Sequence, residues 1–134
     1  MFKLFTLEGA TRLLPVVETH LANLQGAVHD VATLRAAAMT ARDGSVAARN
    51  LLHEVAFVVT VAHDAKAELD RLGVEVTDAE HGAVAFPAQL GGEVVSLTWR
   101  RGQDAITHYR RLSGDGEASP AEQPLERHPS KLAD

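Results

Sequence analysis

Residues 51–72 read LLHEVAFVVTVAHDAKAELDRL, and they decide the fold because their apolar positions recur in alternating steps of four and three. At this spacing an α-helix presents one continuous stripe to a helix that runs alongside it. The β-branched run at 58–61 would also suit a strand, but the helical pattern continues on both sides of it. We therefore expect a helix that Gly73 ends. Its stripe consists of Leu51, Val55, Val58, Ala62, Ala65, Leu69 and Leu72.

A second stripe with the same spacing lies upstream, and it predicts a partner helix from Leu7 to about Met39. Thr6 is a good N-cap for this helix. Pro15 lies inside the pattern, so it should either kink the helix or end a short first segment. Residues 42–45, Arg-Asp-Gly-Ser, predict the end of the first helix and the start of the second. So short a connection makes the two helices antiparallel neighbours. The upstream stripe consists of Ala10, Leu14, Val17, Leu21, Leu24, Val28 and Val31.

Apolar residues within 51–62 point in nearly every direction around the helix. A helix of this kind is buried on more than one side, which two helices alone cannot achieve. Phe57, Val59 and Val61 are the surplus residues, and either the C-terminal sheet or a second copy of the chain must cover them. We expect an interface at these three residues, in a homodimer whose paired coiled-coil hairpins form a four-helix bundle.

After Gly73 the apolar period changes to two, which is typical of strands. Candidate strands are 74–76, 83–86, 93–100 and 105–112, with turns at 91–92 and 101–104. The expected fold class is α+β: a long antiparallel helical hairpin followed by a small three-stranded antiparallel β-meander, in one domain over 1–112. Residues 113–134 are rich in Gly, Asp, Glu, Pro and Ser, so they predict a loosely ordered tail with a few ordered residues near Pro124-Leu125.

The composition of the chain limits the cell compartments and the classes of partner that fit it. The chain has 134 residues, no cysteine and a formal net charge of −5. No disulfide or thiolate site can form, and the acidic balance argues against nucleic acid as a partner. No apolar run reaches the roughly 18 residues of a membrane span, and the N-terminal residues lack the apolar run of a signal peptide. We expect a cytoplasmic protein without a membrane partner.

One candidate ligand surface lies around the turn at 101–104. A hairpin there brings Trp99 and Arg100 near His108, Tyr109 and Arg110, and these five residues could hold a phosphate, a carboxylate or a stacked base. Alternation sends neighbours to opposite sheet faces, so only some of the five can converge. The alternative is that the arginines decorate the sheet and pair with acids such as Glu93 or Asp104.

Histidines and carboxylates of the second helix suggest a divalent metal as a further alternative. The candidate ligands are His53, Glu54, His63 and Asp64. The two histidines lie about 80° apart around the helix, so a site would need residues from another helix or another subunit. The alternative is that these side chains are solvated. No other cofactor is indicated, and no catalytic residue is assigned because no nucleophile–base pair or phosphate loop is visible.

Several segments are similar to a known family. They are 5–10 (FTLEGA), Leu13-Leu14-Pro15, 82–88 (GAVAFPA), 92–100 (GEVVSLTWR) and 102–106 (GQDAI). Through them the chain resembles, over about residues 5–125, the uncharacterised bacterial family called domain of unknown function 2203. The resemblance implies a helical hairpin with a small C-terminal sheet, and it implies no activity.

The chain departs from this resemblance at several polar positions. Family members tend to carry Asp at position 85, Cys at 98, Glu at 103, Trp-His at 109–110 and Arg-x-Pro near 122–124, where this chain has Ala85, Thr98, Gln103, Tyr109-Arg110 and Glu122-Gln123-Pro124. If those positions form a family site, this chain has changed its ligand or abandoned the site. The function that the sequence favours is a non-enzymatic, self-associating interaction or scaffold protein, and the alternative is a binding module for a small anionic ligand or a divalent metal.

Overall fold

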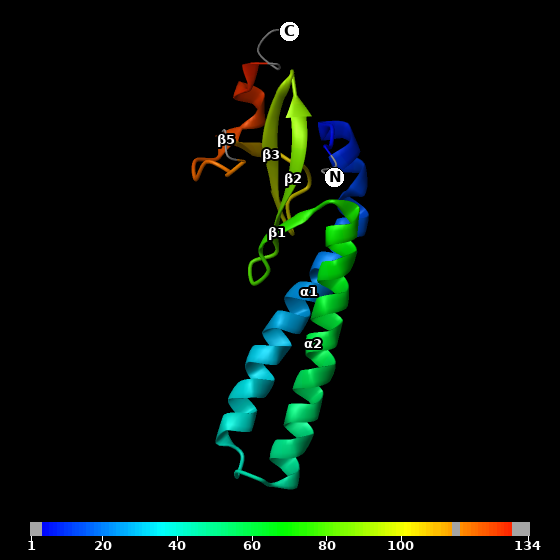
Figure 1. Ribbon diagram of the computed structural model, residues 1–134, viewed down its shortest axis with the longest axis vertical. Helices are drawn as coiled ribbons and strands as arrows, with labels where there is room; N and C mark the ends of the chain where they lie inside the picture. Colours follow the sequence, from blue (N-terminus) through cyan, green and yellow to red (C-terminus); the bar gives the residue numbers. More distant parts are fainter. Residues whose placement is uncertain (1–3, 114–115, 130–134) are drawn as a thin grey trace.

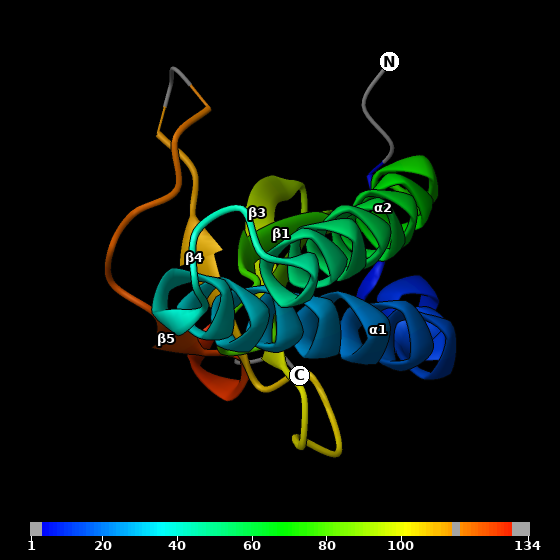
Figure 2. The same ribbon diagram turned by 90° about the horizontal axis from the view of Figure 1, so that it is seen from below.

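The computed structural model describes residues 4–113 and 116–129 and has an elongated shape, with a helical hairpin at one end and a sheet at the other (Figure 1). Helix α1 (Leu7–Thr40) and helix α2 (Val46–Leu72) form the hairpin. Seen along the long axis, the two helices lie side by side (Figure 2). The expectation of an α+β fold with a long helical hairpin is confirmed.

Both helices begin and end as their sequences predict. The Thr6 hydroxyl accepts a hydrogen bond from the Gly9 N–H at 2.9 Å, and the Ser45 hydroxyl accepts one from the Ala48 N–H at 3.1 Å. Gly73 ends α2 in the left-handed conformation, with φ of 86°. Helix α1 runs on through Pro15, so the alternative that this proline ends a short first segment is wrong.

The sheet has five antiparallel strands in the order β1-β2-β3-β4-β5, where the sequence predicted three. The strands are β1 (Glu75–Asp78), β2 (Ala83–Leu90), β3 (Glu93–Arg100), β4 (His108–Arg111) and β5 (Gln123–Pro124). The 3₁₀ turn η1 (Leu125–Arg127) follows β5. Strand β5 pairs with β4 over only two residues, which is too short to show an alternating pattern in the sequence.

One face of the sheet, the inner face, packs on the helices and forms the core. Because successive strand residues point to opposite faces, every second residue of β2 and β3 is buried there. Helix α1 contributes its apolar residues from Ala10 to Leu24, and α2 contributes Ala65 and Leu69 near its end. The buried sheet residues of this core are Val84, Phe86, Ala88, Leu90, Val95, Leu97, Trp99 and Tyr109.

Phe5 joins the start of α1 to the sheet. Its backbone N–H donates to the Pro87 carbonyl at 2.8 Å, and its carbonyl accepts from the Gln89 N–H at 2.9 Å. Its ring meets the ring of Phe86 edge-on, with 5.4 Å between centroids. These contacts fix where α1 begins, so the first half of α1 lies over the inner face.

The hairpin extends well beyond the sheet (Figure 1). We call residues 28–60 the distal hairpin. Of these residues only Ala48 and Val55 are buried, because among the described residues only those of the partner helix cover them. In the part of the chain that the structure describes, no helix is long and apolar enough to cross a membrane.

A polar cluster attaches the residues after β5 to the sheet. His128 is only 2% exposed, and its Nε2 lies 2.8 Å from Glu93 Oε1. The guanidinium of Arg111 pairs with the same carboxylate and lies 5.7 Å from the centroid of the Tyr109 ring. We call Glu93, Tyr109, Arg111 and His128 the C-terminal latch.

The latch predicts an acid-sensitive contribution to stability. The hydrogen bond from His128 holds the pKa of Glu93 below its ordinary value of 4.5, and Arg111 acts in the same direction against the opposing effect of burial. Since the folded pKa is the lower one, the stabilisation is complete above the unfolded pKa and disappears as pH falls through the folded pKa. Glu93→Gln should therefore lower the free energy of unfolding at neutral pH by about 1 kcal/mol and flatten its decline in acid.

Urea denaturation at a series of pH values measures both effects. Glu126→Gln is the matched control, because Glu126 is an exposed carboxylate in the neighbouring η1 turn. If the free energy of unfolding fell equally steeply with decreasing pH in the wild type and in Glu93→Gln, the acid sensitivity would not come from Glu93.

Candidate ligand cleft on the outer face of the sheet

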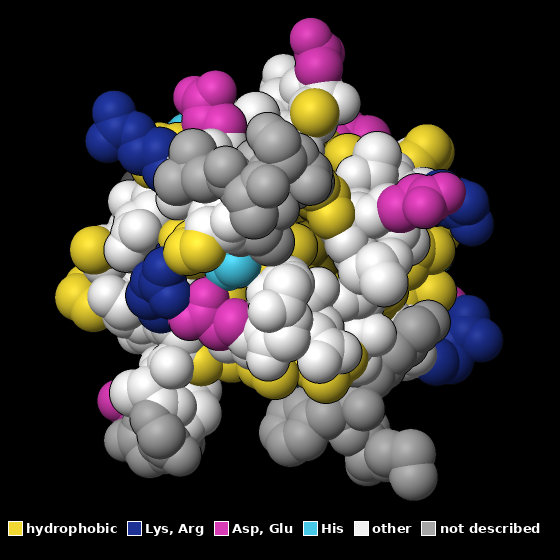
Figure 3. Space-filling view, turned by 90° about the horizontal axis from the view of Figure 1, so that it is seen from above, with side chains coloured by type: hydrophobic (Ala, Val, Ile, Leu, Met, Phe, Trp, Pro, Cys, Tyr) yellow, Lys and Arg dark blue, Asp and Glu magenta, His cyan; other side chains and the backbone are white. Residues whose placement is uncertain are grey.

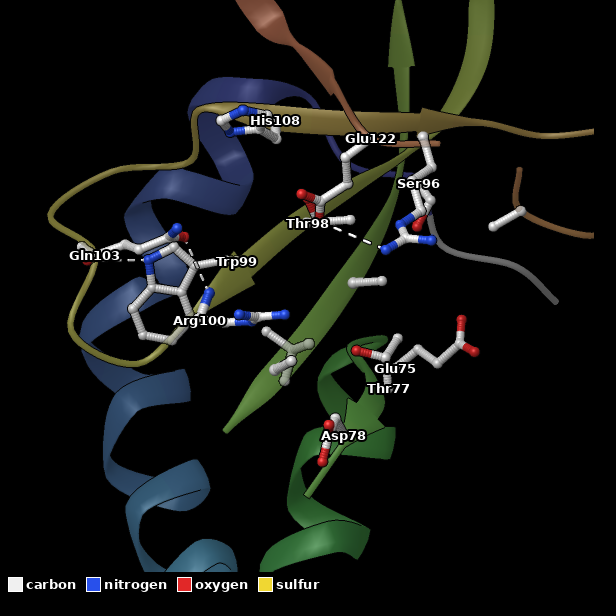
Figure 4. A pocket seen from close by; sticks show the side chains of 15 residues that line it. Glu75, Thr77, Asp78, Ser96, Thr98, Trp99, Arg100, Gln103, His108 and Glu122 are labelled. Atoms are coloured by element: carbon white, nitrogen blue, oxygen red, sulfur yellow. Dashed lines mark hydrogen bonds and ion pairs between the residues drawn. The ribbon is translucent and has the colours of Figure 1, made fainter. Parts of the chain in front are cut away.

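The outer face of the sheet, which points away from the helices, holds a cleft of about 470 Å³ (Figure 4). This volume is within the range of small-molecule sites in proteins. Most lining side chains are the strand residues that alternate with the buried core residues. The lining consists of Glu75, Thr77, Asp78, Ala83, Val84, Ala85, Ser96, Thr98, Trp99, Arg100, Gln103, His108, Arg110, Ala118 and Glu122.

Strand register arranges the cleft as three parallel strips. Glu75 of β1 lies opposite Ala85 of β2, Ala85 lies opposite Thr98 of β3, and Thr98 lies opposite His108 of β4. The β1 strip is acidic and the β2 strip consists of alanines. The β3 and β4 strip is polar and basic, because Arg100 adds its guanidinium there. The alanines make a low apolar floor between taller charged walls.

The structure divides the five predicted ligand-binding residues between the two faces of the sheet. Arg100, His108 and Arg110 line the cleft together. Tyr109 is fully buried on the inner face. Trp99 lies at the margin of the cleft, but its indole belongs to the core, is 4% exposed and donates its N–H to the Gln103 carbonyl at 3.1 Å. The two aromatic rings are therefore packing residues rather than stacking platforms.

Three charged groups of the cleft already have partners. The Arg110 guanidinium donates to the Pro120 carbonyl at 3.0 Å and lies 3.7 Å from the Glu122 carboxylate. Asp78 Oδ2 lies 2.7 Å from His81 Nδ1. This hydrogen bond lowers the pKa of Asp78 and raises the pKa of His81.

Two charged groups of the cleft have no partner. Within residues 4–113 and 116–129, no side-chain hydrogen bond or ion pair engages the carboxylate of Glu75 or the guanidinium of Arg100. Both side chains are exposed, and the Arg100 guanidinium is turned into the cleft with Glu75 on its far side (Figure 4). The cleft therefore offers one uncompensated charge of each sign to a ligand.

Sequence reasoning missed the acidic residues that line the cleft. Asp78 reads as part of a solvated loop, and Glu122 lies in the segment expected to be loose. The polar period-two pattern of Ser96, Thr98 and Arg100 was the signal that could have located the outer face.

Three of the four predicted metal ligands line two separate grooves of the hairpin, and the fourth, Asp64, is exposed and lines neither groove. His53 and Glu54 line a groove of about 500 Å³, the first groove, beside Asp30 and Leu34 of α1. His63 lines the second groove, of about 400 Å³. Among the described residues, no three His, Asp or Glu side chains lie close enough together to hold a metal ion. A single chain therefore does not assemble the predicted metal site from its described residues.

The three predicted interface residues lie on different sides of α2. Phe57 is 71% exposed and borders the first groove, and Val61 is 36% exposed. Val59 lines the second groove. The alternative that the C-terminal sheet covers this apolar surplus does not hold for Phe57, which is exposed on the single chain.

The sheet end of the molecule carries both signs of charge. Figure 3 shows basic and acidic side chains interspersed on this face, with hydrophobic side chains between them. A continuous basic surface, which nucleic-acid binding requires, is not present on the face shown.

These features define a two-layer α+β protein with a projecting helical hairpin and a polar cleft on the outer sheet face. The chain belongs to the family described as uncharacterized conserved protein DUF2203, whose model matches residues 3–116. This confirms the resemblance seen in the sequence. No curated protein and no solved structure matches the chain. Of the positions at which the sequence is expected to depart from that resemblance, 85, 98, 103, 110 and 122 line the cleft, whereas 109, 123 and 124 do not.

The contacts of Arg110 lead to a prediction about the cleft wall. Arg110→Gln should loosen residues 118–122 on the sheet, because it removes the hydrogen bonds to the Ser119 and Pro120 carbonyls and the pairing with Glu122, while the backbone bond from Ser119 to Arg111 stays. Amide hydrogen exchange in this segment should become about tenfold faster. Exchange in β2 should stay unchanged.

Arg127→Gln is the control, since Arg127 is exposed and does not line the cleft. Equal rates of amide hydrogen exchange at 118–122 in the wild type and in Arg110→Gln would show that contacts other than those of Arg110 hold this segment on the sheet.

Proposed function

We propose that this protein is a non-enzymatic, self-associating interaction or scaffold protein whose distal hairpins pair in a homodimer. The observation that carries the proposal is the exposure of large apolar side chains along the hairpin. Met39 is 87% exposed, Phe57 71%, Val46 64% and Leu52 57%. Met39 belongs to α1 and the other three belong to α2, so exposed apolar side chains occur on both helices of the distal hairpin. Exposed apolar surface of this extent is typical of an interface.

A second hairpin is the occupant that best matches this surface. Burying one such side chain contributes about 1.5–3 kcal/mol, and a four-helix bundle buries apolar faces that a two-helix hairpin leaves in water. A twofold contact centred on Phe57 uses the same patch on both copies. It would set each Phe57 against the first groove of the other copy and His53 near that groove's acidic residues, Asp30 and Glu54. A cytoplasmic location fits the absence of cysteine and stays a prediction.

Phe57→Asp should convert the dimer to a monomer. Two phenylalanines leave the interface at once and two carboxylates enter it, so the dimer dissociation constant should rise by about a hundredfold or more. Sedimentation velocity over a range of concentrations measures the change.

Leu4→Asp is the control, because Leu4 is an exposed leucine (45%) next to the sheet and outside the hairpin. A wild-type chain that stays monomeric at every concentration would remove the proposal.

Binding of a small anionic ligand is the second candidate function. It is favoured by the unpaired guanidinium of Arg100, which shares the cleft with His108 and Arg110. A divalent metal has less support, because the described residues of one chain do not assemble a ligand set. No catalytic role is proposed for any residue.

The anionic-ligand candidate predicts a thermal shift with small oxyanions. Millimolar citrate or phosphate should raise the melting temperature of the wild type, because a ligand that binds only the folded state stabilises it. Arg100→Gln should abolish the shift and Arg127→Gln should retain it. A shift of the same size in both variants would point to unspecific screening of charge.

A further inference from the structure

We propose that the cleft binds a small linear zwitterion, with its anionic end at Arg100 and its cationic end at Glu75. This inference rests on the second candidate function and makes it more specific. It starts from the two charged groups that the described residues leave without a partner, one on each side of the alanine floor.

In the sheet, Glu75 and Arg100 lie on strands that are separated by β2, and they are not at the same level along it. Glu75 lies opposite Ala85, and Arg100 lies opposite Ala83, which is two residues before Ala85 in β2. Two strand spacings and a two-residue offset separate their Cα atoms by about 12 Å. Side chains stand roughly perpendicular to a sheet, so a ligand that bridges the two walls must span about this distance and carry a charge at each end.

The floor between the charges suits a short hydrocarbon chain. Ala83 and Ala85 are 8% and 2% exposed, so they form a packed apolar surface rather than a solvated one. The Thr98 hydroxyl lies next to Ala85 across the β2–β3 pair and offers a further donor to an oxyanion at Arg100. A plain anion would leave Glu75 uncompensated, and a plain cation would leave Arg100 uncompensated, so a ligand with both charges gains from both walls.

Three probes of equal chain length separate the possibilities: ε-aminocaproate, caproate, which lacks the amine, and hexylamine, which lacks the carboxylate. Calorimetric titration of the full chain should give a dissociation constant for ε-aminocaproate at least about tenfold lower than for either other probe. Glu75→Gln should weaken ε-aminocaproate to the level of caproate and leave caproate unchanged. Arg100→Gln should remove binding of both.

Glu126→Gln and Arg127→Gln are the matched controls, since they make the same changes at exposed positions outside the cleft and should bind like the wild type. Caproate binding as tightly as ε-aminocaproate would overturn the inference while the anionic-ligand function stands. Hexylamine binding as tightly would overturn it in favour of a cation site. No binding of any probe at millimolar concentration, together with no thermal shift by citrate or phosphate, would remove both the inference and the function on which it rests.

Discussion

The packing of a long hairpin on a short sheet is the constraint on which the rest of the structure depends. The sheet offers one apolar face, and that face reaches only the part of α1 between Ala10 and Leu24 and the last turns of α2. Beyond it each helix has only the other helix as a neighbour. Since two helices can bury only the stripe between them, the remaining apolar side chains of the distal hairpin lie in water. The same two-layer arrangement therefore gives a well-packed core at one end and an unpartnered surface at the other.

The second consequence of two layers is the uncovered outer face of the sheet. Helices cover the inner face alone, so outward residues of β1 to β4 are not needed for the core and can vary in size and charge. Small residues at positions 83 and 85 sit between long charged ones on both sides. The depth of the cleft follows from this contrast in side-chain length and from the segment before β5, which contributes Ala118 and Glu122 to the lining. Most of its chemistry therefore comes from rigid strands rather than from mobile segments.

Local patterns of the sequence were enough to predict the helical hairpin and the antiparallel character of the sheet, but not the number of its strands or all of its contacts. The stripe of Leu51 to Leu72, the cap residue Thr6, the break at residues 42–45 and Gly73 located both helices, because helix signals act within one or two turns. Strand β5 was missed because it is two residues long and is defined by its partner β4. The contact between Glu93 and His128 spans 35 residues of sequence, and no local pattern carries such information. For the cleft, alternation correctly implied that only some of the five predicted residues converge. Its acidic residues come from β1 on one side and from the segment before β5 on the other.

The four arginines around the β3–β4 turn show why proximity in sequence is a poor guide to shared function. Arg100 points into the cleft, while Arg101 donates to Glu18 at 2.9 Å and to Gln25 at 2.7 Å and so binds the turn to α1. Arg110 holds the wall of the cleft, while Arg111 belongs to the C-terminal latch. The period of two sends neighbours to opposite faces, so each adjacent pair divides between the cleft and the scaffold.

Because the latch fixes residues 123–128 and Arg110 fixes residues 119–122, the shape of the cleft depends on contacts made on both faces of the sheet. A substitution in the latch on the inner face should therefore change the affinity of the cleft on the outer face for a ligand, even though no latch residue lines the cleft.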